Sequence, residues 1–401
     1  MHFQFYSCAV VQNWRCADGT IFEHNEVHFA LFGRDLVTNE VVAVTFRYCP
    51  YVIVAHMETA QRIRHTHCDV LQRKLLLGRA DKTVTVYRLY VPMKSEFDRV
   101  MKAYKNNAIE ILDSHHTLEM QLKLVLGLRP LDLISFDCAP ATHKYTTVQR
   151  EYHVPVRLTA ATRKQFPLSI INQSDFCTQP TIMSFDVEAY SDSGAFPTAS
   201  NSHTISICFA LRSLQGELII EKKMVSKGTD TERELLLEFR DEVLRLDPDF
   251  ITGWNTHGFD WPYLLERAKR VEATAFPYLD RVKHHKVEMW GYCYKKPTFI
   301  ARTAFDALHA VRTYKERVAL NTNKPESYKL DYIAQLCLGR GKVELSIPDM
   351  RRAYEQGDLN KPIIVWKTLA CRWIYWSMKV CVSNSSKLLL FLGHPYIKPS
   401  I

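Results

Sequence analysis

Asp186 and Glu188 follow a short apolar run and are separated only by Val187. The run from Thr181 is typical of a mostly buried strand, and residues two apart on a strand project from the same face. The two carboxylates should therefore lie side by side, where they repel each other unless a cation lies between them. Hard oxygen ligands of this kind suit Mg²⁺ or Mn²⁺. An edge strand with two solvated acids is the simpler interpretation of this pattern taken alone.

A third acid, Asp260, favours the metal interpretation. It follows Phe250–Asn255, which is typical of a short strand running into a glycine-containing turn, and it opens a helix with Pro262 in the first turn. A helix-capping aspartate needs no function, because the helix dipole stabilises a carboxylate there. If the two strands belong to one sheet, however, the three acids would converge at one end of it. Such a cluster could hold two metal ions, the arrangement that phosphodiester hydrolysis needs most.

The segments around these acids predict an α/β domain. Thr204–Leu211 and Glu217–Ile220 are strand-like, and Thr231–Leu244 is an amphipathic helix. Thr231 is a capable N-cap for that helix, with Glu234 at the capping-box position. The apolar stripe of the helix consists of Leu235, Leu236, Phe239 and Val243.

The preceding part of the chain, residues 1–175, is predicted to be a mixed α/β domain without a catalytic constellation. Strand-like and helix-like segments alternate there, and a polar, turn-rich stretch ending in Pro180 indicates a domain boundary. The predicted strands are residues 27–32, 41–48, 51–55 and 83–91, and the predicted helices are residues 95–104, with Ser95 as N-cap, and 116–128.

Composition narrows the class of protein without naming a function. The 401 residues suffice for two or three domains, and the net charge of +9 fits a polyanionic partner without requiring one. The eleven cysteines contain no C-x-x-C pair, which argues against a zinc ribbon and fits a reducing compartment. Neither a signal peptide nor an apolar run of about 20 residues is present, so no membrane partner is expected.

One stretch is distinctly basic. Residues 261–302 contain nine Lys or Arg against four Asp or Glu, interleaved with Trp290, Tyr292 and Tyr294. Cations and aromatic rings together suit a single strand of nucleic acid, through phosphate contact and base stacking. A solvated insert that packs its aromatic side chains inward remains an equal alternative.

Three segments carry a resemblance to a known family. Ser184-Phe-Asp-Val-Glu188 resembles the first exonuclease motif of family B DNA polymerases, and Asp247–Ala268 resembles the second motif with its flanks. Ser327–Lys342 is similar to the segment that precedes the third motif. The resemblance extends from Thr181 to about Asp358 and is weaker before it, where the family has its N-terminal domain.

The resemblance implies a ribonuclease-H-like 3′→5′ exonuclease domain over residues 176–361, preceded by the family's N-terminal domain over 1–175. It implies that Asp186 contacts two metal ions, Mg²⁺ or Mn²⁺, that Glu188 binds the ion holding the attacking water, and that Asp260 helps hold the other. Asn255 and Phe259 would shape the pocket for the 3′-terminal nucleotide, or be purely structural. The implied partners are a DNA primer 3′ end, single-stranded DNA and replication accessory proteins, in the nucleus or at a viral replication site.

The third motif of the family, Y-x-x-x-D on a helix, is not found where it is expected. Residues 362–401 contain no Asp or Glu but three of the seven tryptophans, which suggests a wrong reading frame, a retained intron or a degraded gene. The ordinary alternative is a divergent, basic, apolar pair of helices. Tyr354–Asp358 has the right spacing, but Gly357 suits a turn better than a helix, so Asp358 is a weak candidate for a fourth metal ligand.

These gaps limit the expected activity. The polymerase carboxylate motifs would lie beyond Ile401, so this chain alone is not expected to synthesise DNA, and the missing ligand predicts little nuclease activity. Two alternatives stay open: a non-catalytic DNA-binding remnant of such a polymerase, and a free-standing nuclease of the ribonuclease-H-like superfamily. The polymerase-like flanks and the large N-terminal region argue against the second.

Overall fold

The computed structural model describes residues 1–11, 26–74, 83–114, 116–141, 145–173, 178–191, 195–226, 231–291, 294–314 and 326–338. The chain divides into two compact units, Met1–Gln173 and Ser174–Ile401, and both combine helices with sheets. The α/β class expected from the sequence is therefore confirmed. Asp358 and residues 362–401 lie outside the described residues. No helix within the described ranges is long and apolar enough to cross a membrane.

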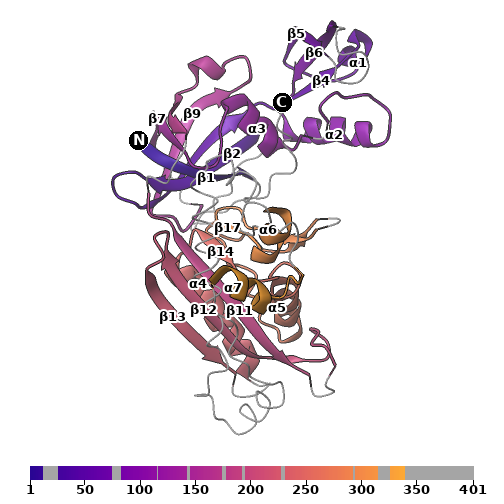
Figure 1. The fold of residues 1–401 in the computed structure, drawn as a ribbon. Coiled ribbons are helices and arrows are strands. Elements are labelled where there is room, and N and C mark those ends of the chain that lie inside the picture. Colours follow the sequence, from indigo (N-terminus) through magenta and orange to yellow (C-terminus); the bar gives the residue numbers. More distant parts are fainter. Residues whose placement is uncertain are drawn as a thin grey trace. The chain divides into compact units, whose positions relative to one another are not determined.

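The first unit contains two sheets (Figure 1). The larger sheet has the strand order β10-β7-β1-β2-β3-β9-β8, and the smaller has the order β4-β6-β5. The strands of the larger sheet are β1 (His2–Val11), β2 (Val27–Asp35), β3 (Val41–Tyr48), β7 (Asp132–Phe136), β8 (Ala139–Pro140), β9 (Arg150–Leu158) and β10 (Leu168–Gln173). The smaller sheet and the helices are β4 (Tyr51–Val54), β5 (His67–Lys74), β6 (Thr83–Tyr90), α1 (Met57–Gln61), α2 (Lys94–Lys105), α3 (Leu118–Leu126) and the short 3₁₀ helix Arg163–Gln165.

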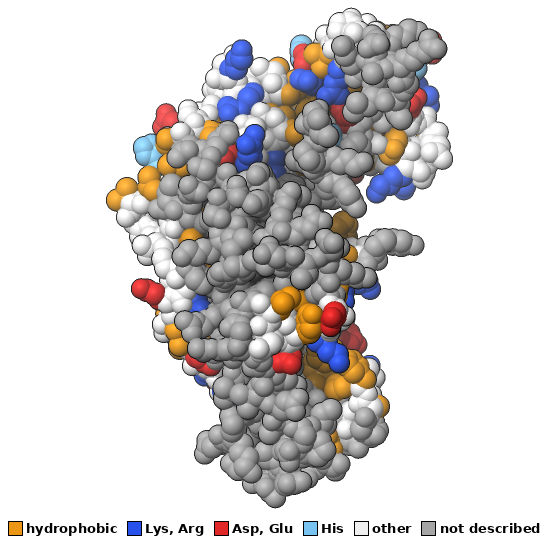
Figure 2. Space-filling view, in the orientation of Figure 1, with side chains coloured by type: hydrophobic (Ala, Val, Ile, Leu, Met, Phe, Trp, Pro, Cys, Tyr) orange, Lys and Arg blue, Asp and Glu red, His pale blue; other side chains and the backbone are white. Residues whose placement is uncertain are grey.

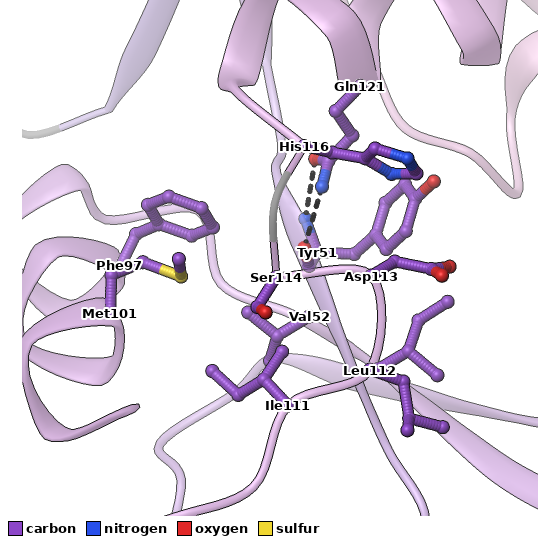
Figure 3. A pocket seen from close by; sticks show the side chains of 11 residues that line it. Tyr51, Val52, Phe97, Met101, Ile111, Leu112, Asp113, Ser114, His116 and Gln121 are labelled. Carbon is purple, nitrogen blue, oxygen red and sulfur yellow. Dashed lines mark hydrogen bonds between the residues drawn. The ribbon is translucent and has the colours of Figure 1, made fainter. Parts of the chain in front are cut away.

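The side chain of Gln121, on α3, joins the two sheets of this unit. Its Oε1 accepts hydrogen bonds from the Tyr48 hydroxyl at 2.8 Å and from the Tyr51 N–H at 3.0 Å. Its Nε2 donates to the Tyr51 carbonyl at 2.8 Å, and Figure 3 shows the pair of bonds with Tyr51. Tyr48 ends β3 and Tyr51 begins β4, so one buried amide holds both strand ends to α3. The cavity beside it measures about 20 Å³, enough for one water molecule and far too small for a nucleotide.

The second unit is built on a five-stranded sheet with the order β13-β12-β11-β14-β17 (Figure 1). The first three strands are antiparallel, whereas β14 and β17 run parallel to β11. Numbered along the chain the order is 3-2-1-4-5, the expected ribonuclease-H-like arrangement. The strands are β11 (Thr181–Tyr190), β12 (His203–Ser213), β13 (Leu218–Val225), β14 (Phe250–Thr252) and β17 (Thr303–Ala304). A hairpin, β15 (Met289–Trp290) and β16 (Lys296–Pro297), and the helices α4 (Glu232–Leu246), α5 (Asp260–Arg270), α6 (Ala307–Tyr314) and α7 (Leu330–Leu338) complete it.

The alternation of β11 decides which side chains face the helices. Met183, Phe185, Val187 and Ala189 are buried in one core with side chains of α4 and α5. The rings of Phe185 and Trp261 meet edge to face at 4.9 Å in that core. Because side chains alternate along a strand, Asp186 and Glu188 project from the opposite face of the sheet, where both are half-buried.

The two helix starts predicted from the sequence differ in outcome. Thr231 is the N-cap residue of α4, as predicted, but its hydroxyl lies 3.1 Å from that of Ser226 and caps no N–H of the helix. Helix α2 begins at Lys94 with Met93 as its N-cap residue, so Ser95 lies inside the helix. In both cases the sequence pattern identifies the residues near a helix start, but not the hydrogen bond at the cap.

A buried ion cluster fixes the start of β11 to β14. Arg281, only 1% exposed, donates to Asp247 Oδ1 at 2.8 Å and to Asp249 Oδ1 at 2.9 Å. The other oxygen of Asp249 accepts the Thr181 N–H at 2.9 Å. Arg302 adds a second buried guanidinium, 2.8 Å from Asp247. Buried charges need such partners, because an unpaired ion in the interior is costly.

We expect Arg281→Met to lower the free energy of unfolding by about 3–5 kcal/mol, because it leaves the buried Asp249 carboxylate without its main partner. Urea denaturation measures the loss. Arg245→Met is the matched control, since Arg245 is 58% exposed and its pair with Glu242 should be worth less than about 1 kcal/mol. Equal losses in the two variants would contradict this account of the cluster.

Candidate active site

One hydrogen bond links the two segments that carry the predicted acids. The Val187 N–H, which lies between Asp186 and Glu188, donates to Asp260 Oδ1 at 3.0 Å. Asp260 is the first residue of α5 and is only 2% exposed. The start of α5 is therefore fixed against β11 at the position of the two strand acids. This position lies beyond the carboxyl end of β14, the edge where ligands commonly bind in α/β sheets.

The sheet itself creates the need for that bond. Strand β14 pairs with β11 only over Ile182–Ser184, so the Val187 N–H lies past the end of their pairing. A buried N–H needs an acceptor, and the Asp260 carboxylate takes the place of a strand carbonyl. The pairing with β12 also shifts its register directly after Glu188, and such bulges re-aim side chains at functional sites.

The turn from β14 to α5 approaches β11 closely. A Cβ atom on Gly253 would lie 2.5 Å from the Phe185 carbonyl oxygen, so only glycine fits there. Two residues further on, Asn255 has a φ of +59°, in the left-handed region that asparagine tolerates better than most residues. These two backbone features let the chain turn sharply enough to place Asp260 beside β11.

Asp306 is a fourth acid at this site, and it was not identified from the sequence. Its Oδ1 accepts the Asn255 N–H at 3.0 Å and the Leu308 N–H at 2.9 Å, and its Oδ2 accepts the His257 N–H at 3.0 Å. It thus holds the turn between β14 and α5 from the end of β17. A signal was present in the sequence, since Asp306 follows a phenylalanine at a strand end, as Asp186 and Asp260 follow phenylalanines.

Burial and like charge act on these carboxyls together. Burial, helped by the neighbouring Asp306 and Glu188 carboxylates and opposed by the Val187 N–H bond, raises the pKa of Asp260 to about 8. Burial also raises the pKa of Asp306. A divalent cation beside Asp260 would favour its ionised form, which burial in the apo protein disfavours.

The donor set fits a hard cation in its chemistry, although it is not a closed cage. Asp186, Glu188 and Asp260 offer carboxylate oxygens, the ligands that Mg²⁺ and Mn²⁺ prefer. Among the described residues, however, no three or more His, Cys, Asp or Glu side chains form a group that could hold a metal ion. The fourth ligand considered from the sequence, Asp358, is outside those residues.

Asn255 and Phe259 lie at the same turn. The Asn255 amide packs against Gly258, where a Cβ atom would lie 2.4 Å from its Oδ1. The Phe259 ring stacks on Tyr263 at 5.4 Å and meets the Phe196 ring at 5.6 Å. Because Phe196 is exposed, this aromatic group opens to solvent beside the acids.

Only some of the basic side chains in residues 261–302 are exposed at the surface. Arg281 and Arg302 are buried in the ion cluster, and Arg267 pairs with the buried Glu232. Trp290 is 69% exposed, so its side chain does not pack inward, whereas Tyr292 lies outside the described residues. On the face that Figure 2 shows, the described Lys and Arg side chains are scattered and form no continuous patch.

Comparisons with known proteins agree on one family. Residues 134–333 match the model of the exonuclease domain of family B DNA polymerases. The chain is similar to the DNA polymerase delta catalytic subunit of Arabidopsis thaliana, with 32% identity over 187 residues, which cover 41% of this chain and 16% of that protein. It is also similar to the corresponding subunit of Candida albicans, with 21% identity over 336 residues, covering 76% and 31%.

A viral protein and a solved structure extend the comparison. The DNA polymerase catalytic subunit of Tupaiid herpesvirus 1 is 28% identical over 204 residues, covering 45% of this chain and 17% of that protein. The structure of the family B DNA polymerase from the archaeon Pyrobaculum calidifontis covers 97% of this chain with a TM-score of 0.60. That match covers 45% of the archaeal chain at 19% identity, so it shows the fold. The chain spans 16 to 31% of the length of these curated relatives.

We expect the stability of the metal-free protein to depend on pH through Asp260. The unfolded carboxyl releases its proton near its usual pKa of 3.8, whereas the folded one keeps it up to about pH 8. The folded state therefore binds more protons in that window, and the free energy of unfolding falls as the pH rises through it. Asp260→Asn has no proton to release and keeps an oxygen that can accept the Val187 N–H.

Urea denaturation of both proteins in EDTA tests this expectation. The variant should gain on the wild type as the pH rises from about 5 to about 8, by at least about 1 kcal/mol. Parallel pH profiles would show that the Asp260 carboxyl titrates normally.

Proposed function

This chain belongs to the family B DNA polymerases, and from that membership we propose that it is the N-terminal and proofreading 3′→5′ exonuclease portion of such an enzyme. The proposed N-terminal domain comprises residues 1–175 and the proposed exonuclease domain residues 176–361. The proposed reaction is hydrolysis of the terminal phosphodiester at a DNA 3′ end, with release of a nucleoside monophosphate. The single observation that supports the proposal is the bond from the Val187 N–H to Asp260, which holds the start of α5 against the strand segment that carries Asp186 and Glu188.

The three acids are proposed to hold divalent cations, Mg²⁺ or Mn²⁺, as exonuclease domains of this family generally do. Bound there, the cations would neutralise the phosphodiester and activate water for attack on phosphorus. Asp186 and Glu188 approach the site from β11, and Asp260 approaches it from the start of α5. Their positions come from rigid elements, and rigid placement is what catalysis by oriented groups requires.

The turn and its aromatic neighbours are proposed to bind the terminal nucleotide. Phe259 and the exposed Phe196 offer ring faces on which an unpaired base can stack. Asn255 offers an amide beside them, and Asp306 is a positioning residue, because it holds the backbone of that turn through Asn255 and His257. A mispaired end unpairs at low cost, so it would reach this site as a single strand more often than a paired end.

The partners follow from the proposed reaction. They are a primer 3′ end and single-stranded DNA, with replication accessory proteins, in the nucleus or at a viral replication site. A non-catalytic DNA-binding remnant is the second candidate. The observation that favours it is that the described residues form no closed group of three metal ligands.

We expect Mn²⁺ binding to separate the two candidates. The wild-type chain should bind one or two Mn²⁺ ions if the three proposed carboxylate ligands act together, and Asp186→Asn should abolish or greatly weaken that binding. Electron paramagnetic resonance of free Mn²⁺ measures the stoichiometry. Asp241→Asn, an exposed acid on α4, is the matched control and should bind as the wild type does. A wild-type chain that binds no Mn²⁺ would favour the remnant.

We expect slow, metal-dependent shortening of a 5′-labelled DNA duplex with a mismatched 3′ end. The products should be one nucleotide shorter at each step, and Asp186→Asn should reduce the rate to background, while Asp241→Asn should not. The rate should be low, because the third motif is missing from the expected stretch of sequence. Shortening at the rate of a complete proofreading enzyme would contradict the expected low rate. Shortening that Asp186→Asn leaves unchanged would show that hydrolysis does not take place at the proposed site.

A further inference from the structure

We propose that a pocket beside the three acids binds one nucleoside 5′-phosphate unit, either within a DNA strand or as a free mononucleotide. The pocket measures about 320 Å³, at the small end of the range of about 300–1,000 Å³ for small-molecule sites. Residues that the argument uses line it from three elements: Asn255, His257, Tyr294, Lys295, His309 and Arg312. The identification of DNA as the source of the ligand rests on the proposed function.

This pocket adjoins the carboxylate site and shares Asn255 and Asp306 with it. Its lining comes from the turn after β14, the β15–β16 hairpin and α6, and it includes none of Asp186, Glu188 and Asp260. The two sites share the turn, since Asn255 lines the pocket and Asp260 follows five residues later. A nucleotide held in the pocket would therefore lie next to one held at the acids.

One wall of the pocket is a flat aromatic stack. The Tyr294 ring lies on the His309 imidazole, with centres 4.2 Å apart and planes inclined by only 21°. Tyr294 is 41% exposed, so part of its ring is open to a ligand. Exposed flat rings of this kind bind nucleobases by stacking, with little dependence on which base is present.

The rim of the pocket is positively charged. Lys295 and Arg312 are both exposed, and neither pairs with a carboxylate in the described part of the chain. Asp306 is the one acid among the described lining residues, and its oxygens already accept the N–H groups of Asn255, His257 and Leu308. The Arg312 guanidinium lies over the Tyr328 ring, 5.4 Å from its centre, but neither cation is neutralised by an acid among the described residues, so both can contact a phosphate, the commonest contact between proteins and nucleic acids.

One residue of the pocket lining, His257, carries a buried nitrogen without a hydrogen-bond partner in the described part of the chain. His257 is only 6% exposed, and its Nδ1 lies 2.8 Å from the Tyr294 hydroxyl oxygen. Its Nε2 is buried and has no hydrogen-bond partner among the described residues. Buried polar atoms are rarely left unpaired, because losing water without gaining a partner is costly. The Nε2 atom is therefore an unsatisfied group within the pocket lining.

Binding of a labelled oligothymidylate of about ten nucleotides to the full chain in EDTA, followed by fluorescence anisotropy, tests the charged rim without hydrolysis. We expect the double variant Lys295→Gln, Arg312→Gln to bind roughly tenfold more weakly, with a salt dependence shallower by about 1 in logarithmic slope. Lys286→Gln is the matched control, since Lys286 is exposed, pairs with Glu288 and does not line the pocket. It should stay within about twofold of the wild type.

The aromatic wall has its own pair of variants. Tyr294→Leu should weaken binding roughly tenfold, because it removes the stacking ring. Tyr294→Phe keeps the ring and loses only the hydroxyl beside His257, so it should retain most of the affinity. The proposal is overturned if the double variant and Tyr294→Leu both bind within about twofold of the wild type, or if the wild type does not bind the oligonucleotide.

Competition distinguishes the two sources of the ligand. Displacement of the oligonucleotide by thymidine 5′-monophosphate, but not by inorganic phosphate, would show that the pocket takes a free mononucleotide. Displacement only by a second oligonucleotide would show that it takes a unit of the strand. The experiments separate this proposal from the proposed function. If Asp186→Asn loses Mn²⁺ binding but the pocket variants bind the oligonucleotide normally, the pocket proposal alone is overturned. If the pocket variants bind the oligonucleotide weakly but Asp186→Asn keeps normal Mn²⁺ binding, the proposed nuclease function alone is overturned.

Discussion

The hydrogen bond from the Val187 N–H to the Asp260 carboxylate is the constraint on which this site depends. It exists because β14 stops pairing with β11 after Ser184 and leaves a buried donor without a strand partner. An acceptor had to come from outside the sheet, and a carboxylate at a helix start supplies it without disturbing the helix. The close approach at Gly253 and the three N–H bonds to Asp306 follow from that requirement, because they bend and hold the turn that delivers Asp260.

The same arrangement lowers stability, because it buries a carboxylate next to other acids. Asp260 is buried and lies near Glu188 and Asp306, so its ionised form is unfavourable. Elsewhere in this unit buried charges are arranged differently: Arg281 lies between Asp247 and Asp249 and is fully paired. The charges around Arg281 are balanced, whereas the Asp260 carboxyl has no balancing cation among the described residues. Such a contrast within one unit is typical of a scaffold that carries a functional site.

The sequence predicted the features that depend on local pattern. The alternation along β11, the stripe Leu235–Val243 of α4 and the position of Asp260 at a helix start all follow from side-chain periodicity and are present in the structure. Features that depend on tertiary contact were missed. Asp306 has no neighbouring acid in sequence, and the burial of Arg281 and Arg302 cannot be read from a count of charges. The Thr231 hydroxyl contacts the Ser226 hydroxyl and not the helix N–H that it was expected to cap.

The hydrogen bonds of Gln121 affect local unfolding of the first unit. Its single amide is bonded both to the last residue of β3 and to the first residue of β4, so neither sheet can open at that corner without releasing the other. Opening at this corner is therefore coupled between the ends of β3 and β4, although they belong to different sheets.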